Sequence, residues 1–151
     1  CGVTPRSTTP TPSHRVDRAG IKPRPARQIP IWFGGGSKVA MRRAARLGDG
    51  FTFAGSGRKI IEQVGRIRDD VAANGRDPDA FPVELTVAYG LPPEKWDSIA
   101  ADARAAGVDY LSVNTMSTTS AWAGTPAPNL TSPAEHIAAL ETFARRIGTD
   151  Q

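Results

Sequence analysis

The residues best placed to do chemistry are the small ones at positions 34–37, Gly34, Gly35, Gly36 and Ser37. They separate an apolar run at residues 29–33 from a helix-forming run at residues 38–47. A strand that turns at once into a helix through small residues directs several backbone N–H groups, and the positive helix end, at one spot. That spot suits a phosphate group, and we predict a phosphate site there.

The glycine run has a second interpretation. It is neither a GxGxxG fingerprint nor a Walker loop, and glycine is the usual residue of any tight turn, so a turn with no ligand is the alternative. In both interpretations Ser37 is predicted to cap the helix and Gly48 to end it in the left-handed conformation. The apolar stripe of this helix is predicted at spacings typical of a helix, on Val39, Ala40, Ala44 and Leu47.

Composition limits the classes of function. The chain has 151 residues and a net charge of +4, and its 19 basic residues are spread along it rather than clustered with aromatics, which argues against nucleic-acid binding. No apolar run is long enough to span a membrane, so we expect a cytoplasmic protein with no membrane partner. One cysteine and two histidines without ligand spacing predict neither a disulfide nor a metal site.

The beginning of the chain is unusual because Cys1 stands where an initiator methionine is expected. We expect the sequence to start inside a longer reading frame. A lipid-bearing cysteine followed by a polar linker, as in bacterial lipoproteins, is the alternative. Residues 1–13 are rich in Thr and Pro and are predicted to be a disordered or unrelated segment, and residues 14–28 an extended linker.

From residue 29 to residue 148 the pattern is strand then helix, four times over. The predicted strands cover residues 29–34, 51–54, 83–89 and 108–114, and the predicted helices cover residues 38–47, 58–74, 92–106 and 133–147. Short connections between such elements are typical of parallel βα units and of the α/β class. A small doubly wound sheet is one way to complete this fold, and half of a (βα)8 TIM barrel is the other.

Six segments of the chain together resemble the luciferase-like monooxygenase family, over about residues 14–148. They are HRVDRAGI (14–21), IPIWFGG (29–35), RRAARLGDGF (42–51), NGRDP (74–78), AGVDYLSVNTM (106–116) and EHIAAL (135–140). The resemblance implies a TIM barrel of which this chain is the C-terminal four βα units. It also implies an oxidoreductase that uses coenzyme F-420 or FMN on a small organic substrate. A non-catalytic α/β phosphate-binding module is the alternative.

The same resemblance implies the site residues. It places the cofactor phosphate at Gly34, Gly35, Gly36 and Ser37, with Ala40 one turn inside the helix. Substrate contacts are predicted at the carboxyl ends of later strands, where barrel active sites are assembled. These candidates are Gly55, Ser56, Arg58 and Asn114. No catalytic residue is assigned, because the redox chemistry belongs to the cofactor and much of its platform comes from the N-terminal half of the family's barrel. The expected partners are a small-molecule substrate and either a second copy of the chain or the missing half.

Overall fold

The structure is a computed structural model, and it describes residues 10–11, 14–15, 23, 25–55, 57–118, 121 and 124–148. Two short strands, β1 (Pro10–Thr11) and β2 (His14–Arg15), pair antiparallel with each other. The remaining strands form one parallel sheet. They are β3 (Trp32–Gly34), β4 (Gly50–Ala54), β5 (Val83–Ala88) and β6 (Tyr110–Asn114).

Each strand of the parallel sheet is followed by a helix, as the sequence predicts. The helices are α1 (Lys38–Leu47), α2 (Arg58–Ala73), α3 (Pro93–Ala105) and α5 (Pro133–Ile147). Four parallel βα units in an α/β fold are thus confirmed. No helix within the described part of the chain is both long enough and apolar enough to cross a bilayer.

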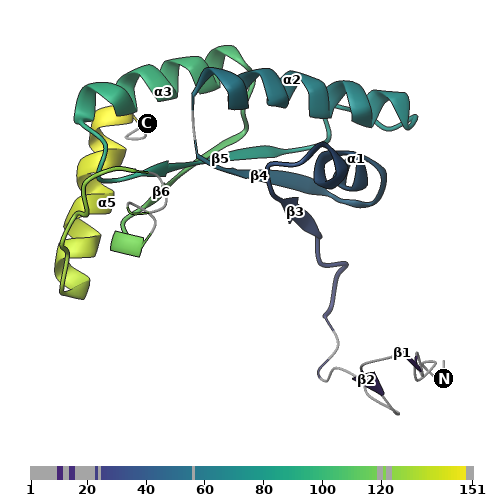
Figure 1. The fold of residues 1–151 in the computed structure, drawn as a ribbon, viewed down its shortest axis with the longest axis horizontal. Coiled ribbons are helices and arrows are strands. Elements are labelled where there is room, and N and C mark those ends of the chain that lie inside the picture. Colours follow the sequence, from purple (N-terminus) through teal and green to yellow (C-terminus); the bar gives the residue numbers. More distant parts are fainter. Residues whose placement is uncertain are drawn as a thin grey trace.

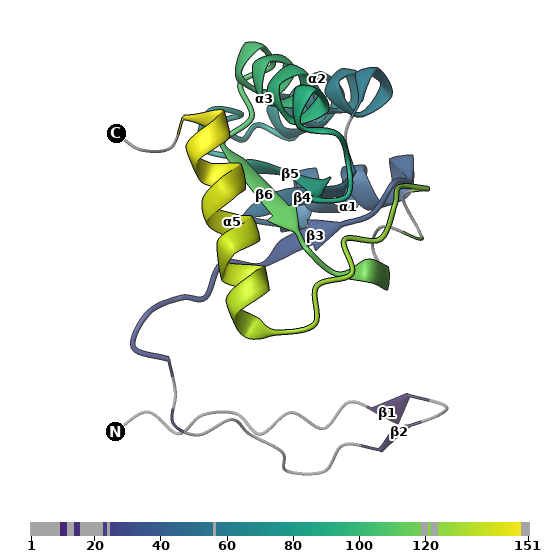
Figure 2. The same ribbon diagram turned by 90° about the vertical axis from the view of Figure 1, so that its left-hand side faces the viewer.

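The strand order decides between the two predicted architectures. The strands lie in the order β3-β4-β5-β6, which is also their order along the chain. Because parallel crossovers are right-handed, a strand order that never reverses places every helix on the same face of the sheet. The helices follow one another around one side of the sheet in Figures 1 and 2. This is the winding of a barrel, whereas a doubly wound sheet reverses its order and carries helices on both faces.

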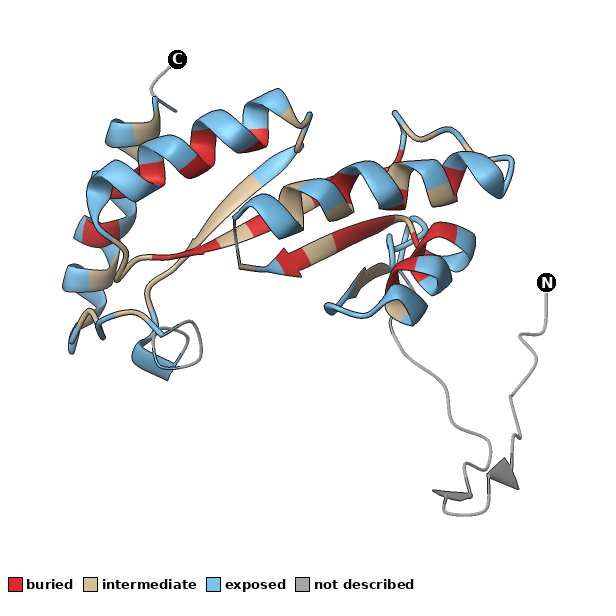
Figure 3. Cartoon of the chain, turned by 45° about the horizontal axis from the view of Figure 1, so that its top comes forward, coloured by how far each residue is buried: buried red, intermediate tan, exposed pale blue. Residues whose placement is uncertain are grey.

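The core lies between the sheet and the helices. Along β5 the side chains of Val83, Leu85 and Val87 are buried and those of Glu84 and Thr86 are half-buried, so the apolar side of the strand faces the helices. Neighbouring strands are in register, and the buried residues therefore form rows with Phe51 and Phe53 of β4. Figure 3 shows this burial as red on the strands and on the inward sides of the helices.

The sheet is strongly curved. Trp32 of β3 and Tyr110 of β6 lie on opposite edge strands, which would be about 14 Å apart in a flat sheet. Their ring centroids are nevertheless 5.7 Å apart. Trp32 reaches across the side of the sheet that lacks helices by lying over Gly50, where an added Cβ would come within 2.6 Å of the indole ring. The two edges therefore bend toward each other, as in a segment of a barrel.

Carboxylates fix the amino ends of the strands. Asp49, which precedes β4, accepts a hydrogen bond from the backbone N–H of Ile31 at 2.9 Å. Asp109, which precedes β6, accepts one from the N–H of Val83 at 2.8 Å and another from Arg68 at 3.2 Å. Each aspartate thus holds the start of the neighbouring strand.

Three predictions about the first βα unit are wrong. Gly48 ends α1 in an extended conformation, with φ −92° and ψ 164°, rather than in the left-handed one. Its lack of a side chain serves packing instead, because an added Cβ would lie 2.7 Å from the ring of Phe33. Val39 and Leu47 are 58% and 59% exposed, since α1 buries Met41, Ala44 and Ala45 instead.

Candidate functional site

The glycine turn after β3 contains three glycines in three different situations. Gly34 is crowded, because an added Cβ would lie 3.2 Å from Cγ2 of Thr52. Gly35 has a φ of +126°, a conformation that L side chains rarely adopt. Gly36 has neither constraint, since nothing lies within 4 Å of an added Cβ. The fold therefore explains Gly34 and Gly35, whereas Gly36 leaves open space beside the turn.

Helix α1 begins directly after this open space. The Ser37 hydroxyl accepts a hydrogen bond from the N–H of Ala40 at 3.1 Å, which confirms the predicted N-cap. An α-helix leaves its first N–H groups without partners inside the helix, and this end carries the positive pole of the helix dipole. No acidic residue occupies the first turn of α1. The end of the helix thus keeps its positive potential for a ligand.

A cavity of about 270 Å³ adjoins the glycine turn. It lies at the carboxyl ends of β3 and β4, between the turn and the first two turns of α2. Its lining residues are Gly35, Gly36, Phe53, Ala54, Lys59, Ile60 and Gln63. Lys59 and Gln63 bring a cation and an amide to the same space as the open position at Gly36. An anionic group fits this combination of a lysine, an amide and a helix N-terminus.

Lys59 and Gln63 are functional candidates that sequence reasoning missed. They are one helical turn apart on α2, and this spacing is visible in the sequence. The signal that could have found them is the parallel sheet itself. Turns at the carboxyl ends of neighbouring parallel strands lie side by side, so the start of α2 must approach the turn before α1. Arg58, the cation predicted from the sequence, lies one position too early on the helix.

The predicted substrate residues do not converge on this cavity. Gly55 continues β4 by donating its N–H to the carbonyl of Thr86 at 3.1 Å, and its φ is +123°. Arg58 is exposed at the start of α2 and does not line the cavity. The side chain of Asn114 accepts a hydrogen bond from the N–H of Met116 at 2.9 Å, which shapes the loop after β6. Ser56 lies outside the described residues.

The loop after β6 is also held to α5. The hydroxyl of Thr115 and Nδ1 of His136 are 2.7 Å apart, and both residues are half-buried. This contact gives His136 a structural partner at the carboxyl edge of the sheet. In the described parts of the chain, no three His, Cys, Asp or Glu side chains are grouped so that they could hold a metal ion.

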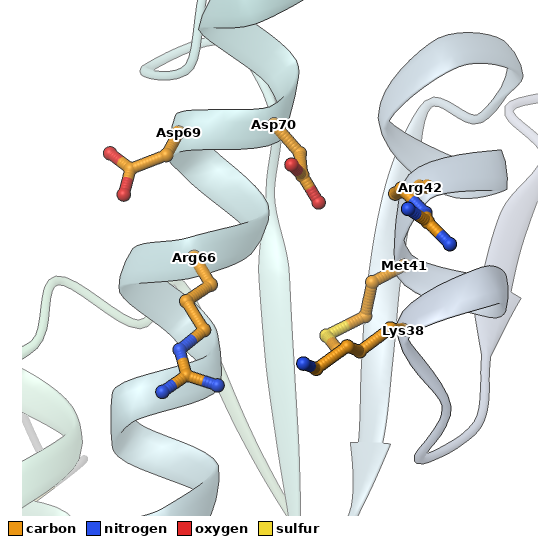
Figure 4. A pocket seen from close by; sticks show the side chains of 6 residues that line it. All are labelled: Lys38, Met41, Arg42, Arg66, Asp69 and Asp70. Atoms are coloured by element: carbon orange, nitrogen blue, oxygen red, sulfur yellow. The ribbon is translucent and has the colours of Figure 1, made fainter.

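A second hollow, of about 450 Å³, lies between α1 and α2. Figure 4 shows its lining residues, which are Lys38, Met41, Arg42, Arg66, Asp69 and Asp70. Lys38 and Met41 extend from α1 toward α2, whereas Asp69 points away from α1 (Figure 4). The mixed charges of this groove select no single ligand, and we assign it no function.

A comparison with protein families decides the relationship of the chain. Residues 6–106 match the family described as luciferase-like monooxygenase. The chain belongs to that family. The match to the luciferase-like monooxygenases begins before residue 14 and ends at the close of α3, so β6 and α5 lie beyond it. It includes the glycine turn and the cavity beside it. No curated protein matches the chain.

Two solved structures resemble the chain loosely. One is an F420-dependent secondary alcohol dehydrogenase in complex with an F420-acetone adduct, with 11% identity and a TM-score of 0.47. The match covers 91% of this chain and 47% of that one. The other is DmoA from Hyphomicrobium sulfonivorans, with 15% identity and a TM-score of 0.42, covering 93% of this chain and 34% of that one. The chain therefore spans about half of the first structure and a third of the second.

Proposed function

We propose that the chain contributes the phosphate-binding corner of an oxidoreductase that uses coenzyme F-420 or FMN on a small organic substrate. The cavity beside Gly36 carries this proposal. Membership of the luciferase-like monooxygenase family supports the redox role. The resemblance of the six sequence segments to that family implies F-420 or FMN as the cofactor.

The residues around the cavity fit the phosphate of such a cofactor. The open position at Gly36 lets an oxygen approach the backbone, and Lys59 and Gln63 of α2 line the same cavity. The Ser37 hydroxyl already accepts from the N–H of Ala40, so the N–H groups of Lys38 and Val39 in the first turn of α1 remain for the ligand. In this proposal Lys59 neutralises the negative charge of the phosphate, while the glycine turn and the N-terminus of α1 fix its position.

When bound, the flavin or deazaflavin supplies the two-electron redox step. The described residues bind and orient its phosphate tail. Gly34, Gly35, Gly36, Ser37 and Ala40 form the proposed cofactor contact. Gly55, Ser56, Arg58 and Asn114 remain proposed substrate contacts at the carboxyl ends of the strands.

Cofactor titration tests the site. We expect the chain to bind FMN or F-420 more tightly than riboflavin, which lacks the phosphate. Gly36→Asp should lower the affinity for FMN or F-420 at least about fivefold, because a carboxylate a few ångströms from a phosphate costs on the order of 1 kcal/mol or more. Lys59→Gln should weaken binding in the same direction. Fluorescence of the cofactor provides the measurement.

Two matched variants control this experiment. Gly36→Asn has nearly the same shape as Gly36→Asp without the charge, and Arg58→Gln removes a neighbouring cation that does not line the cavity. Gly36→Asn should bind the phosphorylated cofactors more tightly than Gly36→Asp does. Arg58→Gln should bind them more tightly than Lys59→Gln does. Equal affinities of the wild type and Gly36→Asp for the phosphorylated cofactors, or no preference over riboflavin, would contradict the site. Binding without reduction of the cofactor would favour the non-catalytic module.

A further inference from the structure

The sequence contains one Asn-Gly pair, Asn74 and Gly75, at the end of α2 and apart from the proposed cofactor site. In such a pair the backbone nitrogen of the glycine can attack the side-chain amide carbon of the asparagine. Glycine has no Cβ to obstruct this attack. The other asparagines, Asn114 and Asn129, precede threonine and leucine, whose side chains hinder it. Both residues of the pair are exposed, so water reaches them.

The folded chain keeps the two reacting groups apart. Asn74 is the C-cap of α2, with a ψ of 10°. At this ψ the nitrogen of Gly75 nearly eclipses the backbone nitrogen of Asn74 and not its Cβ, so attack requires rotation about the Cα–C bond. Nδ2 of Asn74 donates to the carbonyl of Asp70 at 2.7 Å, and the N–H of Gly75 donates to that of Ala72 at 2.9 Å. Formation of the ring therefore requires both hydrogen bonds to break.

Arg76 holds the chain directly after the pair. Its guanidinium group donates to the carbonyl of Ala45 in α1 at 2.9 Å. The guanidinium carbon also lies 5.6 Å from the centre of the Phe81 ring. These contacts tie the residue that follows Gly75 to α1 and to the core. Because rotation at Asn74 would move Arg76, the contacts oppose the local opening that the reaction needs.

We propose that Asn74 is a deamidation site that the end of α2 keeps closed in the folded chain. When this end opens, a base removes the proton of the Gly75 nitrogen, and the nitrogen forms a bond to Cγ of Asn74. The Cγ–Nδ2 bond breaks, and ammonia leaves with a proton returned by the solvent. Water then opens the imide ring without any oxidation or reduction. Cleavage of the new N–Cγ bond gives aspartate, and cleavage of the backbone C–N bond gives isoaspartate.

Either product changes the end of α2. An aspartate at position 74 places a negative charge at the negative pole of the helix dipole, one turn after Asp70, and it loses the donor to the Asp70 carbonyl. An isoaspartate adds a carbon atom to the main chain before Arg76 and displaces its contacts. Because Arg76 joins this end of α2 to α1, the reaction should weaken the packing between the two helices.

Incubation at mildly alkaline pH, followed by peptide mass spectrometry, tests the site. We expect Asn74 to react at least about tenfold more slowly in the folded chain than in guanidinium chloride, because only the locally open form reacts. In the denaturant, Asn114 and Asn129 should react more slowly than Asn74. Arg76→Gln should raise the rate at Asn74 in the folded chain and leave the rate in denaturant unchanged. Arg66→Gln, at an exposed position of the same helix, is the matched control and should change neither rate.

Three results would overturn the proposal. They are equal rates at Asn74 in the folded and unfolded chain, no reaction at Asn74 in denaturant, and a folded-state rate that Arg76→Gln leaves unchanged. Circular dichroism identifies a variant that has unfolded, and hydrogen exchange of the wild type then decides. The Gly75 amide should be protected by about the same factor by which the fold slows deamidation, since both need the same opening. Very different factors would contradict the gate. No cofactor is needed, so the outcome is independent of the proposed phosphate site.

Discussion

At the scale of single residues, the start of α5 contains a carboxylate whose pKa is strongly lowered. Glu135 forms a capping box with Ser132, and its carboxylate accepts hydrogen bonds from the N–H groups of Thr131 and Ser132, each at 2.8 Å. These bonds, with those from the two hydroxyl groups, lower the pKa of Glu135 from 4.5 to about 2. Four donors on one carboxylate favour its charged form.

This pKa predicts a pH dependence of stability. Because the pKa is lower in the folded chain, the carboxylate stabilises the fold fully above about pH 4.5, and that contribution disappears as the pH falls toward about 2. Glu135→Gln should therefore lower the melting temperature at neutral pH, and the difference from the wild type should close between about pH 4.5 and 2. Thermal melts followed by circular dichroism measure it.

The control for this prediction is Glu141→Gln on the same helix. The carboxylate of Glu141 makes one contact of 3.9 Å with Arg145, and both side chains are exposed. Such pairs contribute little to stability. If the difference in melting temperature between Glu135→Gln and the wild type stayed constant down to about pH 2, the lowered pKa of Glu135 would be contradicted.

At the scale of elements, the residue types at the ends of the helices follow local capping rules. The residues that each helix buries follow such rules less closely. Ser132 caps α5, and Gly75 and Gly107 adopt the positive φ values with which α2 and α3 end. Gly48 is different, because the ring of Phe33 and not the backbone requires a glycine there. Glycines in this fold therefore serve two purposes, a positive backbone φ at helix ends and space for a neighbouring side chain.

Two glycine-to-alanine changes should have opposite effects. Gly65 lies in the middle of α2, with nothing within 4 Å of an added Cβ. Gly65→Ala should stabilise the fold by about 0.5–1 kcal/mol, because alanine favours the helix. Gly48→Ala should destabilise it by about 1–3 kcal/mol, since the methyl group would meet Phe33 and the carbonyl of Ala44. Urea unfolding measures both changes, and effects of the same sign would contradict these two assignments.

The connection between α3 and α5 is another feature of this scale. Arg146 forms a two-point ion pair with Asp97, at 3.0 and 2.7 Å, and the hydrogen bond to Asp97 raises the pKa of Arg146. Arg104 donates to the carbonyl of Ile147 at the end of α5. Trp96 packs its ring against Phe143 beneath these contacts. Helix α5 is thus fixed on α3 through Phe143, while Ile137 and Leu140 stay exposed.

At the scale of the whole molecule, the fold is a curved four-stranded sheet with helices on its convex side. Its concave side has Trp32 and Tyr110 at the amino end and polar residues such as Thr86 and Ser112 further along. The hydroxyl of Ser112 donates to that of Thr86 at 3.1 Å. A sheet of this kind gains stability when another surface covers its edges.

The sequence alone determined which segments form the parallel strands and their helices, although it did not predict the short pair β1 and β2. The reasons are local: hydrophobic periodicity, the Ser37 and Ser132 caps, Pro133 in the first turn of α5, and glycines where a helix ends. These act between residues a few positions apart, so they can be read from the order of residue types. The position of the glycine turn between a strand and a helix was determined in the same way.

Only the tertiary structure decided which distant residues meet. Lys59 lines the same cavity as Gly36, Trp32 reaches Tyr110, and Phe33 requires the glycine at position 48. These contacts depend on strand order, curvature and crossover direction, which arise when the elements pack together. The exposure of Val39 and Leu47 has the same origin. Periodicity shows that a helix has an apolar face, but the neighbouring elements decide which residues become buried.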